Sequence, residues 1–415
     1  MGYPTRFSRE RSTPNVVSRR AFYHPELDVL RFFAFLAVFL HHVLPRESGH
    51  YLENGLSPFA TEWMLAAKEA GAYGVDLFFV LSSYLITELL LREHASRGKF
   101  SVPAFYIRRA LRIWPLYFTF LAATVFVIPR IFPDERFGPK YIGSFALFVG
   151  NWVCAFYGLP FSVASPLWSI SVEEQFYLGW PLLLLIFGVS RIRHLAVAMI
   201  AIAVATRVLL AAFDVEHPGV WCNTFARLDS IAVGAILAVS LGGHAPRIKR
   251  VPRVILFFVS LVMFLLAAKY LGQDGPSSIV TYSVTAVAGV MLLVAVLHTD
   301  AAFLRLRPFS WFVYLGRISY GLYVFHLLSI ALLPTLFVTA FGIAPTFGQR
   351  VVLSFLLTVL FAASSYTWLE EPFLRLKRRF TYGEAELPAG SRGSALDHRA
   401  RALPETSYPR RHSLH

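Results

Sequence analysis

The sequence is poor in cysteine and in charged residues. It has 2 Cys among 415 residues, and Asp, Glu, Lys and Arg together make up 15% of the chain. Cys154 and Cys222 cannot build a disulfide framework, and neither stands at a metal-like spacing from His or another Cys, so we expect no metal site. A soluble domain carries about 25% charged residues. The shortage of charge therefore argues against a soluble enzyme.

Apolar residues predominate in the sequence. The chain is 56% hydrophobic and contains 38 Phe, which is more than the core of a soluble domain requires. This composition predicts a polytopic membrane protein. The net charge of +14 would suit a nucleic-acid partner, but the basic residues lie in short loops between apolar runs and in the tails. We assign them to membrane topology and expect no nucleic-acid partner.

Ten apolar runs are long enough to cross about 30 Å of hydrocarbon. They predict an all-α polytopic bundle of about ten transmembrane helices with a polar cavity. An eleventh run, residues 141–157, contains Gly143, Gly150 and Asn151, and we predict that it does not cross. The ten predicted spans are residues 28–45, 73–91, 110–128, 172–189, 195–213, 228–242, 252–271, 278–298, 312–335 and 348–369.

The distribution of basic residues predicts the orientation. With ten spans and a cytoplasmic N-terminus, the inner loops hold fourteen Lys and Arg and the outer loops hold six, as the positive-inside rule requires. We expect a cytoplasmic tail at 1–26, one membrane domain at 27–372, and a basic, disordered cytoplasmic tail at 373–415. Because the first run contains Arg31 and lacks a small-residue cleavage site, we do not expect a removed signal peptide.

The first apolar run contains two ionisable residues, Arg31 and His42. Eleven residues of α-helix advance about 20° past three full turns and rise roughly 16 Å, so the two share one face. An ionisable group inside a bilayer is costly and points to function. We predict that His42 is catalytic. The alternative is that Arg31 snorkels to the interface and a neighbour satisfies the histidine.

Several carboxylates are predicted to enter the outer half of the membrane. They are Asp76, Asp229, Glu173 and Glu174. A histidine that takes a proton from a hydroxyl needs a carboxylate to orient it and to stabilise the imidazolium. We predict that Asp76 and one of the two glutamates support His42, and the sequence leaves open which glutamate. The alternative for the two aspartates is a helix N-cap.

A basic pair opens the third predicted span on the inner side. Arg109 and Arg112, three residues apart, share one helical face and can grip phosphates through bidentate hydrogen bonds. The alternative is a topological anchor. Arg31 also lies toward the inner end, so a phosphate-bearing donor could enter from the cytoplasm and reach toward His42. For His326, in the middle of a span, we favour a structural role over a catalytic one.

Taken together, these segments resemble the bacterial acyltransferase-3 family of integral membrane acyltransferases. The resemblance runs from about residue 25 to 375. It implies an acyl-CoA donor, usually acetyl-CoA, on the cytoplasmic side and transfer of the acyl group to a hydroxyl. The matching residues are Leu27-Asp28-Val29-Leu30-Arg31 with His42, Gly74-Val75-Asp76-Leu77-Phe78-Phe79-Val80-Leu81-Ser82, Arg109 with Arg112 and Pro115, Trp168-Ser169-Ile170-Ser171-Val172-Glu173-Glu174-Gln175-Phe176-Tyr177, and Ser319-Tyr320-Gly321-Leu322-Tyr323 with His326.

The resemblance also implies functional roles for Arg31, His42 and the pair Arg109 and Arg112. We therefore expect a membrane O-acyltransferase of the bacterial inner membrane that acts on a glycan or lipid of the cell surface. Ser83 stands where the family usually has Gly, which we expect to alter packing more than chemistry. No esterase-like domain follows, as it does in some relatives, so we expect a soluble or export partner that handles the acceptor.

Two questions stay open at this point. Residue identity cannot separate direct transfer with His42 as a general base from an acyl-histidine intermediate. A different class of function, a transporter or flippase of a lipid-linked glycan, would use the same polar residues to line a path. Transporters often contain inverted repeats and paired broken helices, and the sequence shows neither.

Overall fold

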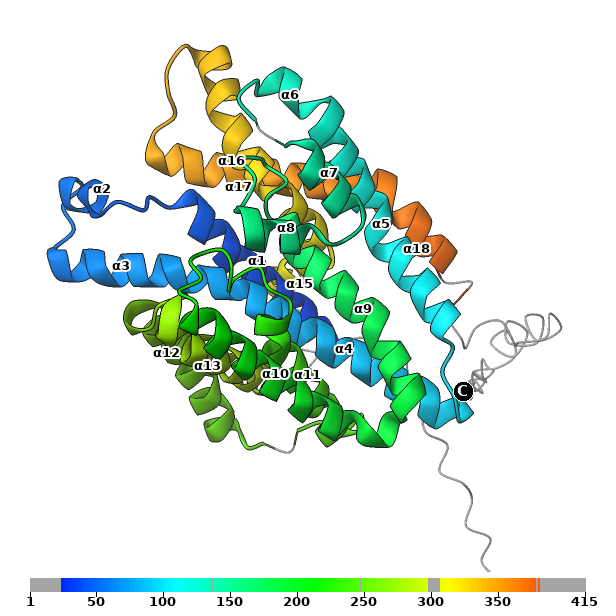
Figure 1. Ribbon diagram of the computed structural model, residues 1–415. Helices are drawn as coiled ribbons and strands as arrows, with labels where there is room; N and C mark the ends of the chain where they lie inside the picture. The colour runs from blue at the N-terminus through cyan, green and yellow to red at the C-terminus, as the bar shows by residue number, and fades with distance from the viewer. Residues whose placement is uncertain (1–23, 136, 247, 298–306, 378–379, 381–415) are drawn as a thin grey trace, which may run out of the picture.

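The computed structural model describes residues 24–135, 137–246, 248–297, 307–377 and 380. These residues form helices joined by short connections, with no β-strand among them (Figure 1). The predicted all-α polytopic bundle is confirmed. Most of the two predicted tails, residues 1–23 and 381–415, lies outside the described residues.

The helices follow one another along the chain in the order in which Figure 1 labels them. They are α1 (Pro25–Val43), α2 (Ser48–Glu53), α3 (Pro58–Ala70), η1 (Gly71–Tyr73), α4 (Gly74–Arg97), α5 (Val102–Phe126), α6 (Ile128–Ile131), α7 (Pro139–Ala146), α8 (Gly150–Tyr157), α9 (Leu167–Phe187), η2 (Val189–Arg191), α10 (Ile192–Ala212), η3 (Phe225–Arg227), α11 (Leu228–Leu241), α12 (Arg250–Tyr270), α13 (Gly275–Val296), α15 (Arg307–Arg317), α16 (Ser319–Phe341), α17 (Phe347–Ser365), η4 (Tyr366–Glu370) and α18 (Glu371–Lys377).

Eight helical segments in the described residues are long and apolar enough to cross a membrane. Two of the ten predicted spans, the helices α1 and α11, are not among them. The first turns of α1 contain Glu26, Asp28 and Arg31. The helix α11 has 14 residues and is therefore about 21 Å long at 1.5 Å per residue. Both helices are largely buried among the other helices of the bundle.

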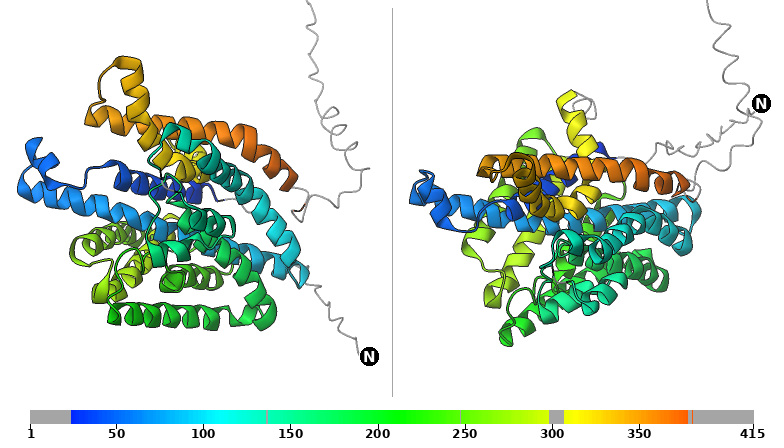
Figure 2. Two further views of the ribbon diagram at one scale, coloured as in Figure 1. Left: turned by 45° about the horizontal axis from the view of Figure 1, so that its top comes forward. Right: turned by 90° about the horizontal axis from the view of Figure 1, so that it is seen from above.

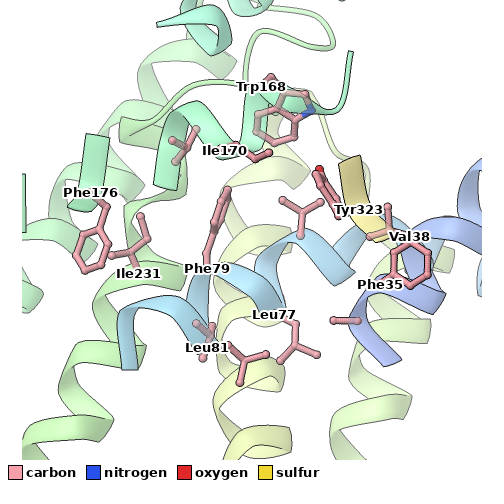
Figure 3. Packing of buried hydrophobic residues seen from close by; sticks show 14 of the residues in the cluster. Phe35, Val38, Leu77, Phe79, Leu81, Trp168, Ile170, Phe176, Ile231 and Tyr323 are labelled. Atoms are coloured by element: carbon pink, nitrogen blue, oxygen red, sulfur yellow. The ribbon is translucent and has the colours of Figure 1, made fainter. Parts of the chain in front are cut away.

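The helix α1 runs through the centre of the molecule and divides the other helices into two groups. It packs against α4 and α13 on one side and against α15, α16 and α17 on the other. Figure 2 shows α10 to α13 on one side of α1 and α16 and α17 on the other. Buried side chains of α1, α4, α9, α11 and α16 form one apolar cluster (Figure 3). A polar residue on the inner face of α1 therefore faces protein.

One continuous helical segment of 40 residues, Pro58–Arg97, contains α3, η1 and α4. It is about 60 Å long at 1.5 Å per residue, twice the thickness of the hydrocarbon, and in Figure 1 α2 and α3 extend beyond the rest of the bundle. The segment crosses α1 at Gly71 and Gly74. A side chain at Gly71 would collide with the carbonyl oxygen of Ala37, and one at Gly74 with that of Ala34. Glycine permits this close crossing.

Two predictions about the spans have different outcomes. Residues 141–157 form the helices α7 and α8 of eight residues each, about 12 Å long, so the prediction that this run does not cross is confirmed. The prediction of one span at 312–335 is wrong in its bounds, because the helix breaks at Ile318 and α16 runs from Ser319 to Phe341. Before the break, Gly316 of α15 packs against the backbone of Asp28.

The close crossing of α1 and α4 predicts that a larger residue at position 74 destabilises the protein. Because a methyl group at position 74 would meet Ala34 and Val38 of α1, Gly74→Ala should lower the free energy of unfolding by about 1–3 kcal/mol. The melting temperature of the purified protein in detergent measures this effect. Gly179→Ala is the matched control, since no atom lies within 4 Å of the added methyl in α9. Equal melting temperatures of the two variants would contradict a tight crossing.

Candidate active site

A polar cavity lies inside the bundle where α1, α4, α5, α9 and α16 meet. Its volume of about 90 Å³ holds several water molecules. Cationic, acidic and hydroxyl groups line it together with apolar residues. The lining residues are Arg31, Val75, Phe78, Phe79, Ser82, Leu85, Arg109, Arg112, Ile113, Ser169, Ile170, Glu173, Tyr177, Ser319, Tyr320 and Tyr323.

Three arginines converge on this cavity from two helices. Arg31 comes from α1, and Arg109 and Arg112 come from one face of α5. Arg31 lies 3.5 Å from Asp28, measured from Nη1 to Oδ1. In the described part of the chain, no carboxylate lies within ion-pair distance of Arg109 or Arg112. The cavity therefore has an excess of positive charge, as a site for an anion requires.

Glu173 is the carboxylate of this cavity. Ser82 donates a hydrogen bond to its Oε1 at 3.1 Å, and Tyr177 donates one to its Oε2 at 2.8 Å. The guanidinium of Arg109 lies 5.7 Å from the centre of the Tyr177 ring, within the range of a cation–π contact. Glu173 and Tyr177 thus form the polar wall beside Arg109.

Glu174 points away from the cavity. It is buried, and its Oε2 accepts a hydrogen bond of 3.1 Å from the indole of Trp114. Adjacent residues of a helix are turned by 100° from one another, which directs the two glutamates to different neighbours. Of the two alternatives that the sequence left open, Glu173 lines the cavity and Glu174 does not.

His42 does not line the cavity and has no carboxylate partner among the described residues. Its Nδ1 lies 2.8 Å from the carbonyl oxygen of Val38, one turn earlier in α1. The adjacent His41 is held elsewhere, with its Nδ1 3.1 Å from the carbonyl oxygen of Lys68. The prediction that a carboxylate supports His42 is therefore wrong, because Asp76, Glu173 and Glu174 are bound to other groups.

Tyr323 stands between the cavity and His42. It lines the cavity, and its ring centre lies 5.5 Å from that of His326, which in turn lies 5.0 Å from that of His42. The hydroxyl of Tyr323 is within 2.7 Å of the hydroxyl of Ser169 and donates to the carbonyl of Pro166 at 3.1 Å. Ring contacts of Tyr323 and His326 thus connect the lining of the arginine cavity with His42.

Asp76 belongs to a buried ion pair. Its Oδ1 lies 2.6 Å from Nη2 of Arg227 and accepts a hydrogen bond of 2.9 Å from Ser230. A second buried pair, Asp229 with Arg207 at 2.8 Å, lies beside it. Neither aspartate caps its helix, so the cap interpretation is also wrong. The four charges cancel and tie α4, α10, η3 and α11 together.

The sequence contained a signal for one of these residues that our prediction missed. Arg207, like Arg31, is an ionisable residue within an apolar span. Such a residue is costly to place inside a membrane and therefore points to a buried partner or a function. Its partner in the tertiary structure could not be derived from spacing, because Asp229 follows on a different helix.

Ser83 affects packing, as predicted. It is buried, its hydroxyl donates to the carbonyl of Val80 at 3.1 Å, and it does not line the cavity. The facing helix α11 has Gly234 at this contact, where a side chain would collide with Ser83. The absence of a side chain on α11 thus makes room for the serine on α4.

The family model described as an acyltransferase domain, Acyl_transf_3, matches residues 24–368. The chain belongs to the acyltransferase-3 family. No solved structure matches it.

Two relatives of this family member are named as O-acetyltransferases. The peptidoglycan O-acetyltransferase OatA of Listeria monocytogenes is 28% identical over 376 residues, which are 84% of this chain and 56% of that protein. A Staphylococcus aureus protein named "Putative O-acetyltransferase" is 25% identical over 370 residues, 85% of this chain and 57% of its own length. The chain thus spans little more than half the length of these relatives.

The Asp76–Arg227 pair makes a testable prediction. Asp76→Asn leaves Arg227 as an uncompensated buried cation, which costs about 3–5 kcal/mol of stability. The double variant Asp76→Asn/Arg227→Gln should recover part of this loss because it removes the stranded charge. The fraction of protein that remains folded after heating in detergent measures the stability of the single and of the double variant. A double variant less stable than the single one would contradict a structural ion pair.

Proposed function

We propose that this acyltransferase-3 family member is a membrane O-acetyltransferase. In this proposal it transfers an acetyl group from cytoplasmic acetyl-CoA to a hydroxyl of a cell-envelope glycan. The observation that carries the proposal is the cavity in which Arg31, Arg109 and Arg112 converge. Among its lining residues only Glu173 has a carboxylate to balance these three positive charges. Three guanidinium groups in one place match the phosphates of a CoA donor, because each can make bidentate hydrogen bonds to phosphate oxygens.

The donor enters from the inner side in this proposal. The basic N-terminal half of α5 lies there according to the charge distribution of the loops. The phosphates bind Arg109 and Arg112, and the pantetheine arm passes Arg31 and the wall of Tyr323. Arg31 and His42 are separated along α1 by roughly 16 Å of helix rise, a distance that the extended arm has to cover for its thioester to reach His42.

His42 acts as the general base. Because its Nδ1 faces the carbonyl oxygen of Val38, Nδ1 carries the proton and Nε2 presents a lone pair. Nε2 takes the proton of the acceptor hydroxyl, whose oxygen attacks the thioester carbonyl. The carbon–sulfur bond then breaks, and the CoA thiolate receives the proton. Proton transfer of this kind contributes roughly 10²–10⁴ in rate.

The name of one relative suggests the first acceptor to test. The Listeria monocytogenes protein is named a peptidoglycan O-acetyltransferase, so peptidoglycan is the first acceptor to test. Mass spectrometry of cell-wall fragments from cells with and without this chain should show an acetyl ester that is lost with the gene. Unchanged acetylation of every envelope glycan and lipid would contradict the proposal.

The cavity arginines predict a substrate-specific effect. Arg109→Gln and Arg112→Gln should each raise the KM for acetyl-CoA by about 10–100-fold, because each removes a charge-assisted hydrogen bond of about 1.5–3 kcal/mol. S-acetylpantetheine, which lacks the phosphates, should be used equally well by wild type and variants. Initial rates of thiol release from purified protein measure both substrates. Arg130→Gln is the control, since Arg130 is exposed in α6.

An equal loss with both substrates would contradict a phosphate-binding role. It would show that the arginines support the fold or the chemistry and not the CoA phosphates.

A further inference from the structure

His326 is a buried ionisable residue that the proposed reaction does not yet use. It lies within α16 and is fully buried. Its Nδ1 lies 2.6 Å from the carbonyl oxygen of Tyr323. Its Nε2 is buried and has no hydrogen-bond partner among the described residues. A buried polar atom without a partner costs about 1–3 kcal/mol and calls for an explanation.

The ring of His326 is in contact with the ring of the proposed base, His42. The ring centres of His326 and His42 are 5.0 Å apart with an interplanar angle of 63°, the geometry of two rings in contact. The ring centre of Phe35 lies 6.2 Å from that of His326. The remaining groups that face the pair are His41, whose ring lies 5.0 Å from His42, and the hydroxyl-bearing ring of Tyr323. The charged groups nearby, Arg46, Lys68 and Glu69, lie on the His41 side.

The backbone fixes the tautomer of both rings. Each Nδ1 points to a carbonyl oxygen of its own helix, that of Val38 for His42 and that of Tyr323 for His326. Carbonyl oxygens accept only, so both Nδ1 atoms carry hydrogen and both Nε2 atoms present lone pairs. One added proton converts this pair of acceptors into a donor and an acceptor. The arrangement is suited to hold one proton.

We propose that His326 is a positioning residue that shares with His42 the proton taken from the acceptor hydroxyl. This inference rests on the proposed function. The oxygen–hydrogen bond of the acceptor breaks, a nitrogen–hydrogen bond forms on Nε2 of His42, and Nε2 of His326 accepts a hydrogen bond from the resulting imidazolium. The acceptor oxygen forms the ester as the carbon–sulfur bond of the donor breaks. The shared proton then leaves with the CoA thiolate.

This role explains how His42 works without a carboxylate. An imidazolium in a site of low dielectric constant needs a hydrogen-bond acceptor. A neutral imidazole supplies a lone pair without adding a second charge to the membrane interior. Asp76 and Glu173, the carboxylates expected for this task, are bound to Arg227 and Tyr177.

His326→Gln tests the inference. The glutamine amide can still donate or accept a hydrogen bond, but it cannot take a proton. In protein labelled with ¹⁵N-histidine and held in detergent, the midpoint of the His42 titration should move to lower pH by about one unit or more. The kcat should fall by about tenfold or more with KM for acetyl-CoA within twofold, since proton-transfer catalysis is worth roughly 10²–10⁴. His244→Gln, an exposed histidine in a loop, is the control.

The titration separates the two proposals. If wild-type protein transfers no acetyl group, the proposed function fails, and the titration still shows whether the two histidines share a proton. If His326→Gln leaves the His42 titration unchanged, the inference is overturned whatever the activity. If His326→Gln does not fold, His42→Gln gives the reciprocal experiment. The midpoint of the His326 titration should then move to lower pH. An unchanged midpoint overturns the inference.

Discussion

Charge inside a membrane has to be balanced, and this constraint organises the molecule. Two buried arginines, Arg207 and Arg227, meet Asp229 and Asp76 at 2.8 and 2.6 Å. They form a neutral cluster whose value lies in joining helices, since a buried pair adds little net stability. Arg109 and Arg112 have no such partner in the described residues. Arg207 and Arg227 help to join the helices of the fold. Arg109 and Arg112, which lack a carboxylate partner, are the reason why we expect an anionic substrate.

The central helix α1 links the two halves of the proposed chemistry. It carries Arg31 into the cavity and His42 into contact with His326. The close crossing at Gly71 and Gly74 holds it against α4. Tyr323 lies between the two, because its ring lines the cavity and also packs on His326.

The helices and the basic face of α5 could be predicted from the sequence. The contacts between helices could not, for a physical reason. Length, hydropathy and loop charge predict the helices and the non-spanning run at 141–157, and helical periodicity places Arg109 and Arg112 on one face. Periodicity describes only one helix at a time. It could not show that Asp76 binds Arg227, that Glu174 faces Trp114, or that His42 meets His326, since each of these contacts joins helices far apart in sequence.

An experimental structure of the His42→Gln variant with acetyl-CoA tests the central claim most directly, because this variant should bind the donor but turn it over slowly. We expect the donor phosphates on Arg109 and Arg112, the arm alongside Arg31, and the thioester beyond Tyr323 next to position 42 and His326. Density for the donor outside the arginine cavity, or a thioester that ends on the cavity side of Tyr323 without a path to position 42, would contradict the account.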